Sequence, residues 1–171
     1  MVYRNTKLDV NLTVAGFGVK GTWEPNEDQY RAAWELYVEL STRVAVIELK
    51  ESEGLLRETL SSLHALFAVS REIMKKYGPD IAVSGSSELS LGFLTVNILN
   101  EVIRPFLSKW HPLLSDYEDK REVTVSRLEH EQNWEKNKEF REHLDFTSKV
   151  LYEYSKLLAK VAGVPNLLEK V

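Results

Sequence analysis

The sequence predicts a mainly α-helical protein: an antiparallel four-helix bundle with an N-terminal two-stranded β-hairpin. Three observations predict this fold. Residues 7 to 14 alternate between apolar and polar side chains, as a half-buried strand does. After Pro25, apolar residues recur with the helical period in four long segments. The connections between those segments are short, which favours antiparallel packing of neighbouring helices.

Length and composition exclude several classes of protein. The chain has 171 residues, so we expect a single domain over 1–171. The absence of Cys excludes disulfides, Cys-ligated zinc, iron–sulfur clusters and thiolate nucleophiles. A net charge of −4 gives no overall attraction to nucleic acid. Because no targeting or membrane-spanning segment is visible, we expect a cytoplasmic protein with no membrane contact.

The hairpin is expected over residues 7–23. Its first strand turns one set of side chains to the same face: Leu8, Val10, Leu12 and Val14. A glycine-rich turn near 15–18 leads to a second strand that ends at about Trp23. A Gly-x-Gly-x-x-Gly string from Gly16 to Gly21 is interpreted as part of this turn, because no helix follows it as a dinucleotide-binding fold requires.

Four helices are expected, over 26–48, 54–77, 87–110 and about 123–162. Asn26 is a good N-cap for the first helix, and Gly78-Pro79 ends the second. In the third helix Pro105 should introduce a kink, because proline lacks a backbone donor and clashes with the preceding turn. A corner is expected at Trp110-His111-Pro112.

The last segment is open to two interpretations. A continuous helix from about 123 to 162 would project beyond the bundle, whereas a break near Asn133 or Asn137 would make five helices. Trp134 is the only large apolar residue between 129 and 139. It either packs back on the bundle, for example on Trp23, or anchors a partner.

The sequence offers no metal or cofactor site. A di-iron bundle needs Glu-x-x-His motifs, and none of the four His residues has a Glu three positions before it. A serine hydrolase needs a Gly-x-Ser-x-Gly elbow between a strand and a helix, and none occurs. We therefore expect no cofactor and no bound metal.

Two Arg–His pairs stand out. Arg57 precedes His64 by seven positions and Arg104 precedes His111 by seven, so each pair can share one helix face. This spacing resembles the Arg-x(4–6)-His signature of HEPN ribonucleases, which are themselves helical bundles. The resemblance implies that the His acts as acid or base on the RNA 2′-hydroxyl, that the Arg binds phosphate, and that bundle dimers form the site.

Each His also has a purely structural interpretation, which the sequence favours. His64 would pack at the core or its edge among apolar neighbours, and His111 would cap the corner between Trp110 and Pro112. A further interpretation places a small apolar ligand near the Pro105 kink. The residues around that ligand would be Leu94, Ile98, Val102 and Phe106.

The leading hypothesis is therefore a non-enzymatic helical interaction module that self-associates or serves as a small adaptor subunit of a larger assembly. The hairpin would extend a sheet or cover a bundle face, and the expected partner-binding residues are Trp134, Trp23 and Phe17. The alternative is a HEPN-like ribonuclease, a toxin or defence component. Its catalytic residues would be Arg57, His64, Arg104 and His111. Nucleic acid is expected as a partner only under this alternative.

Overall fold

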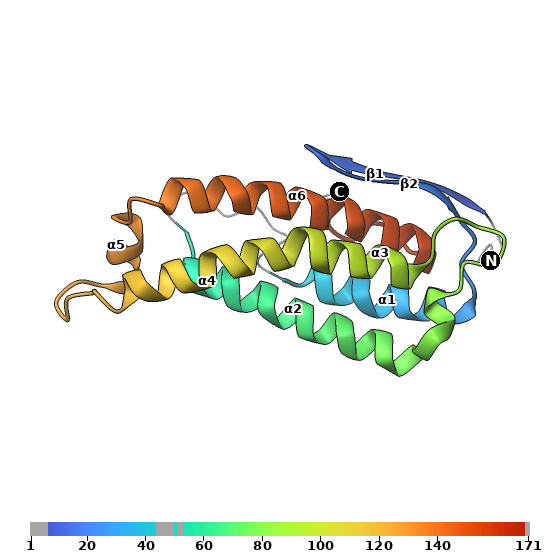
Figure 1. The fold of residues 1–171 in the computed structure, drawn as a ribbon, viewed down its shortest axis with the longest axis horizontal. Coiled ribbons are helices and arrows are strands. Elements are labelled where there is room, and N and C mark those ends of the chain that lie inside the picture. The colour runs from blue at the N-terminus through green and yellow to red at the C-terminus, as the bar shows by residue number, and fades with distance from the viewer. Residues whose placement is uncertain (1–6, 44–49, 51–52, 170–171) are drawn as a thin grey trace.

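Four long helical segments run antiparallel to one another, and the hairpin lies along one side of them (Figure 1). The computed structural model describes residues 7–43, 50 and 53–169. The expected mainly helical fold with an N-terminal two-stranded hairpin is confirmed. None of the described helices is long and apolar enough to cross a membrane.

The hairpin pairs β1 (Leu8–Val14) with β2 (Phe17–Trp23). Its two-residue loop is Ala15-Gly16, and both residues have positive φ, as a tight type I′ hairpin turn requires. Val10 and Leu12 in the middle of β1 are buried, Leu8 and Val14 are partly buried, and the strand packs on the last helix. A two-stranded hairpin is marginal alone, so the bundle supplies the apolar surface that stabilises it.

The first two helices are α1 (Glu27–Ser41) and α2 (Leu56–Tyr77). Asn26 caps α1 as expected, since its side chain accepts the Gln29 amide. The helix ends at Ser41, and the expected end near residue 48 lies outside the described residues. The end of α2 is confirmed: Gly78 follows with positive φ, where a glycine is favoured.

The third helical segment is longer than expected. It begins at α3 (Leu91–Ile98), passes through a π-helical turn (Leu99–Ile103) and continues as α4 (Arg104–Glu118). The expected corner at residues 110–112 is wrong, because Pro112 lies inside α4. Three residues on one side of α4 stay buried along its whole length, and this packing outweighs the lost hydrogen bond of Pro112. They are Phe106, Trp110 and Leu114.

A π-helical turn stands at the place where a kink at Pro105 was expected: it ends at Ile103, and Arg104 and Pro105 begin α4. Proline offers no backbone N–H, and its ring crowds the carbonyl four residues earlier. Here the Arg104 amide donates to the Leu99 carbonyl, five residues back, as π-helical turns do. The helix therefore accommodates the proline by a local change in its hydrogen bonding, and it continues into α4 (Figure 1).

The last segment is broken into α5 (Arg127–Gln132) and α6 (Asn137–Ala162). The continuous helix is therefore wrong, and the alternative break near Asn133 and Asn137 is correct. Asn137 stabilises the break, because its side-chain amide donates to the Glu131 carbonyl at 2.8 Å. Figure 1 shows α5 at the end of the bundle far from the N-terminal residues of β1, next to the end of α4.

Gln29 ties the hairpin to the bundle. Its side chain is fully buried and accepts a hydrogen bond from the indole N–H of Trp23. Its amide nitrogen donates to the Val83 carbonyl at 2.8 Å. One buried amide thereby joins the end of β2, the start of α1 and the loop before α3, which satisfies polar groups that water cannot reach.

Candidate functional site

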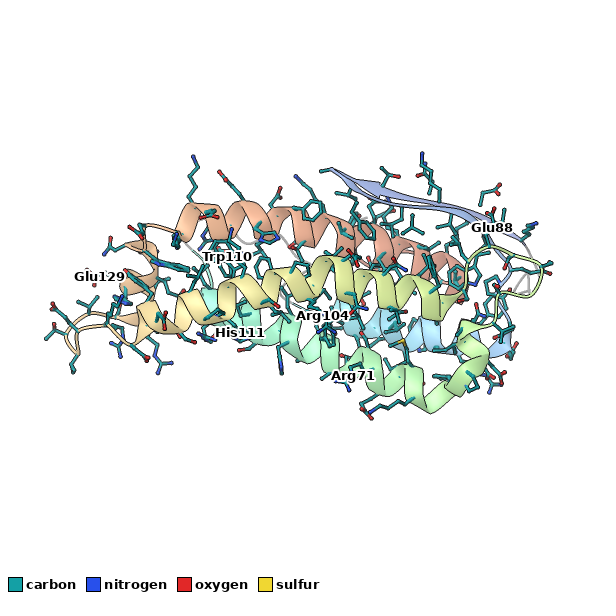
Figure 2. The ribbon with its side chains drawn as sticks, viewed as in Figure 1. Arg71, Glu88, Arg104, Trp110, His111 and Glu129 are labelled. Atoms are coloured by element: carbon teal, nitrogen blue, oxygen red, sulfur yellow. The ribbon has the colours of Figure 1, made fainter. Side chains whose placement is uncertain are left out.

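A polar seam runs along the surface between α2 and α4. We call it the α2/α4 seam and define it by residues spaced seven apart, which share one face of each helix. They are Arg57, His64 and Arg71 on α2, and Arg104, His111 and Glu118 on α4. Figure 2 shows Arg104 and His111 on α4 and Arg71 on α2. Because the helices are antiparallel, Arg57 meets Glu118 and His64 meets His111.

Arg57 is at the centre of the contacts at one end of the seam. Its Nε lies 3.0 and 3.1 Å from the two carboxylate oxygens of Glu118, and its Nη2 is 2.5 Å from Oε2. Nη2 also donates to the Ser115 hydroxyl at 3.1 Å. This is the side-by-side pairing that a planar guanidinium makes with a carboxylate or a phosphate.

The same guanidinium contacts His111. Arg57 Nη1 lies 3.1 Å from His111 Nδ1, and because a guanidinium can only donate, Nδ1 must be the acceptor. The ring is therefore neutral and carries its proton on Nε2, which is buried and has no partner among the described residues. Burial lowers the pKa of His111, and the charge of Arg57 and the nearby His64 lower it further, while Glu118 opposes them.

His64 lies across the seam from His111. The two ring centroids are 6.0 Å apart, and the rings meet edge to face. His64 is exposed, so the packing role expected for it is wrong: its helix buries Leu60 and Leu63 and turns His64 outward. The corner role expected for His111 is also wrong, because α4 runs through it.

Arg104 does not join this group. Its Nε and Nη2 both donate to Asn100 Oδ1 at 3.1 Å, and its guanidinium lies 5.1 Å from the centre of the Phe67 ring. Of the four residues singled out from the sequence, Arg57, His64 and His111 converge and Arg104 lies farther along the seam. The arginine beside His111 belongs to the other helix.

Glu131 supports the site and was not predicted. Its buried carboxylate accepts the backbone amides of Leu56 at 2.7 Å and Arg57 at 3.4 Å, so α5 caps the first turn of α2. Burial raises the pKa of Glu131, against the effect of those two amides. No local sequence pattern could reveal this cap, because Glu131 lies 75 residues from Leu56.

Two of the expected partner-binding residues are buried. Trp134 is only 6% exposed and Trp23 is fully buried, so the expectation that they anchor a partner is wrong for the folded chain. Trp134 packs back on the bundle, but on Trp110 and Tyr117 and not on Trp23. Phe17 is partly buried and packs against the core.

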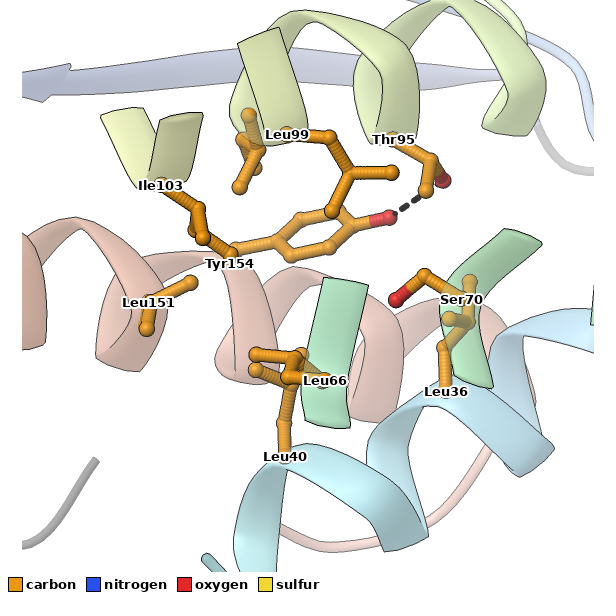
Figure 3. Close-up of a pocket in the computed structure, with 10 residues that line it drawn as sticks. Leu36, Leu40, Leu66, Ser70, Thr95, Leu99, Ile103, Leu151 and Tyr154 are labelled. Carbon is orange, nitrogen blue, oxygen red and sulfur yellow. Dashed lines mark hydrogen bonds between the residues drawn. The ribbon is translucent and has the colours of Figure 1, made fainter. Parts of the chain in front are cut away.

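A cavity in the bundle interior lies near the π-helical turn, but it is too small for an apolar ligand. That cavity measures about 10 Å³, room for about one water. Figure 3 shows Tyr154 in its wall, with its hydroxyl 2.8 Å from Thr95 Oγ1. Burial raises the pKa of Tyr154, so this hydroxyl stays neutral and serves the packing of the core.

Comparison with known proteins finds no similar protein. No protein family, no curated protein and no solved structure matches this chain. The function must therefore be inferred from the α2/α4 seam and the rest of the surface.

Proposed function

We propose that this protein cleaves single-stranded RNA at the α2/α4 seam. The observation that carries the proposal is the convergence of Arg57, His64 and His111 from two helices on one partly exposed site. An arginine beside two imidazoles is a set of groups that can hold a phosphate and move protons around it. The Arg-to-His spacing also resembles that of HEPN ribonucleases.

In this proposal Arg57 binds the phosphate that is cleaved. Its fork already holds a planar pair of oxygens, those of Glu118, in the geometry that suits phosphate oxygens. Glu118 and the substrate therefore compete for the same donors. When the phosphate draws Arg57 away, the lone pair on His111 Nδ1 is released, because Arg57 Nη1 holds it in the free protein.

The two histidines then act as base and acid. Neutral His111 takes the proton of the 2′-hydroxyl, and the 2′ oxygen attacks the adjacent phosphorus. The bond from phosphorus to the 5′ oxygen breaks, and His64, acting as the acid, supplies the proton that the leaving oxygen needs. The products are a 2′,3′-cyclic phosphate and a 5′-hydroxyl. The low pKa of His111 suits the base, because its environment keeps the ring neutral near pH 7.

The test is cleavage of a single-stranded RNA, with the product ends identified by mass spectrometry. We expect His64→Ala and His111→Ala each to slow cleavage by about 10²- to 10⁴-fold. Arg57→Ala should also slow cleavage, and Arg57→Lys should recover only part of it, because lysine cannot make the paired contact.

The matched control is His143→Asn, since His143 lies on α6 outside the seam and its Nδ1 accepts the Trp110 indole N–H, which Asn can also accept. The proposal is overturned if the purified protein leaves RNA intact, or if it cleaves RNA equally well without both seam histidines.

We propose protein–protein association as a second function, supported by a different observation. Two of the exposed large apolar side chains are aromatic and lie on separate helices: Trp34 on α1 is 43% exposed and Phe93 on α3 is 49% exposed. Trp34 also lines a surface hollow of about 360 Å³ together with Tyr30 and Tyr77. Exposed aromatic residues beside a hollow are typical of binding surfaces.

The hairpin adds to this second proposal. Within the described part of the chain, β1 and β2 pair with each other, and beyond that pairing there is a single bridge from Trp23 to Leu89. Each strand therefore keeps an outer edge that another strand could join. Light scattering should show that the protein self-associates and that Trp34→Ala or Phe93→Ala weakens the assembly. A monomer at all concentrations would contradict self-association and leave only association with a different protein.

A further inference from the structure

We propose that Arg71 and Arg104 form a second phosphate-binding subsite at the far end of the α2/α4 seam, for the backbone of single-stranded RNA. The inference rests on the proposed function and extends it, since it names where the strand continues beyond the cleaved phosphate. Three features carry it: the register of the two helices, the contacts of Arg104 and the ion pairs of the chain.

The register of the seam places Arg71 opposite Arg104. Arg57 meets Glu118, and one heptad along, His64 meets His111. The next heptad on α2 ends at Arg71, and the matching step back along α4 ends at Arg104. The Phe67 ring supports this alignment: it lies one turn before Arg71 on α2, and the Arg104 guanidinium covers it at 5.1 Å.

The two ends of the seam differ in how their arginines are neutralised. Arg57 has the Glu118 carboxylate, whereas neither Arg71 nor Arg104 forms an ion pair within residues 7–43, 50 and 53–169. Lys75 and Lys76 on the same helix, by contrast, are paired with Glu72 and Glu35. The seam therefore carries arginines without a bonded carboxylate only at the Arg71 end, in a chain whose net charge is −4.

Arg104 is held ready for an anion. Two of its N–H groups are fixed by Asn100 Oδ1, and its guanidinium carbon lies over the Phe67 ring, 5.1 Å from the ring centre. A guanidinium has five N–H donors, and among the described residues the other donors of Arg104 have no hydrogen-bond partner, which leaves them for a ligand. A guanidinium that is already oriented loses less entropy on binding, and its fork matches phosphate oxygens.

The ligand is the sugar–phosphate backbone and not a base. Arg104 covers the Phe67 face that could otherwise stack a base, and the two arginines offer the charge that phosphates need. Seven residues separate Arg104 from His111, which is about 10 Å along the helix. A strand bound at Arg57 can therefore reach the second subsite by lying along the seam, without regard to its sequence.

The test separates binding from cleavage. A fluorescent single-stranded RNA with 2′-O-methyl groups has no free 2′-hydroxyl and cannot be cut, so its binding is measured by fluorescence polarisation over a range of salt. We expect the double variant Arg71→Ala, Arg104→Ala to bind about tenfold more weakly. Its plot of log affinity against log salt should be shallower by about 0.7 for each phosphate that the variant no longer neutralises.

The charge-matched control is Arg31→Ala, Lys149→Ala. Both residues are exposed, lie on α1 and α6, and pair with acids on their own helices. The subsite is overturned if this control weakens binding and lowers the salt slope as much as the seam variant does. It is also overturned if the seam variant binds as the unaltered protein does.

The outcomes also separate this inference from the ribonuclease proposal. If the protein does not cut unmodified RNA but the arginine variant alone loses binding, the subsite stands and the cleavage proposal fails. If the protein cuts RNA and the arginine variant binds and cuts normally, cleavage stands and the subsite fails. Melting temperatures of both double variants check that the fold is kept.

Discussion

Helix α4 has two faces with opposite character, and the same helix thereby serves both stability and the candidate site. Towards α6 it presents Phe106 and Trp110, which pack on Phe140 with ring centroids 5.1 Å apart. Towards α2 it presents Arg104 and His111. Figure 2 shows Trp110 on the side near α6 and His111 on the side near α2, one residue apart in sequence.

Each face contains or contacts a histidine whose Nδ1 accepts a hydrogen bond, but the donors differ. On the α6 side, His143 accepts from the indole of Trp110 at 2.9 Å. On the α2 side, His111 accepts from the guanidinium of Arg57 at 3.1 Å. The indole of Trp110 is uncharged and buried, so its hydrogen bond to His143 stays in place. A guanidinium at the surface is a charged donor that a phosphate can draw away.

The identity and the pKa of a histidine therefore do not mark it as functional. Burial lowers the pKa of both His111 and His143. What separates them is the donor to Nδ1: the neutral indole of Trp110 for His143, and the charged guanidinium of Arg57 for His111. Substitutions on each side of α4 can show whether its two faces are as separate as this contrast implies.

The largest expected effect lies on the aromatic face. Trp134→Ala removes a ring that packs edge to face on Trp110 at 5.9 Å and stacks on Tyr117 at 5.4 Å. Loss of so large a buried side chain should lower the free energy of unfolding by about 3–5 kcal/mol. Chemical denaturation followed by circular dichroism measures it.

Trp34→Ala is the matched control, because Trp34 is the same residue type at an exposed position. Its effect on the free energy of unfolding should be clearly smaller than that of Trp134→Ala, because much less of the Trp34 side chain is buried. If Trp134→Ala were as mild as Trp34→Ala, the aromatic face would not hold α5 and α6 to the bundle in solution.

A smaller effect is expected where α5 supports the seam. Glu131→Ala leaves the buried Leu56 amide without its acceptor and should cost about 1–3 kcal/mol of stability. Glu131→Gln should cost less, because the amide oxygen can still accept that hydrogen bond and burying it desolvates no charge. Equal stability of the alanine variant and the unaltered protein would contradict the cap.

Much of the fold could be predicted from the sequence because its signals are local. Alternation over residues 7–14 indicated the first strand, and Gly78-Pro79 marked the end of α2. The corner predicted at Pro112 was wrong, because a proline by itself favours the end of a helix, whereas here the buried face of α4 continues past it. Trp134 misled the prediction in a similar way: its neighbours in sequence are polar, but its neighbours in space are aromatic.

The candidate site was predictable in part. Helical spacing indicated that Arg57 shares a face with His64, and Arg104 with His111. It could not indicate that Arg57 would contact His111, because that contact depends on the register between two antiparallel helices and joins residues 54 positions apart. Glu118 and Glu131 were missed for the same reason: each reaches Arg57 only through the packing of another helix against α2.

The smallest effects concern proton binding on the two faces. Both histidines have a lowered pKa in the folded protein, whereas a histidine in an unfolded chain has a pKa of about 6.5. When the pH falls below this unfolded-state pKa, each histidine binds a proton in the unfolded chain more readily than in the folded protein. The stability that the folded protein has at higher pH is therefore lost as the pH falls. His143→Asn should therefore make the fall in melting temperature between pH 7 and 5 shallower.

Arg57→Ala distinguishes the two histidines. After burial, Arg57 is the largest cause of the low pKa of His111, whereas the charge that lowers the pKa of His143 is that of Lys109. Removal of Arg57 should raise the pKa of His111 and leave that of His143 unchanged in an NMR titration of the ring protons. Glu118→Gln should shift His111 the opposite way, because Glu118 raises its pKa. If neither variant moves His111, its titration depends on burial alone, and the α2 face would be as closed as the α6 face.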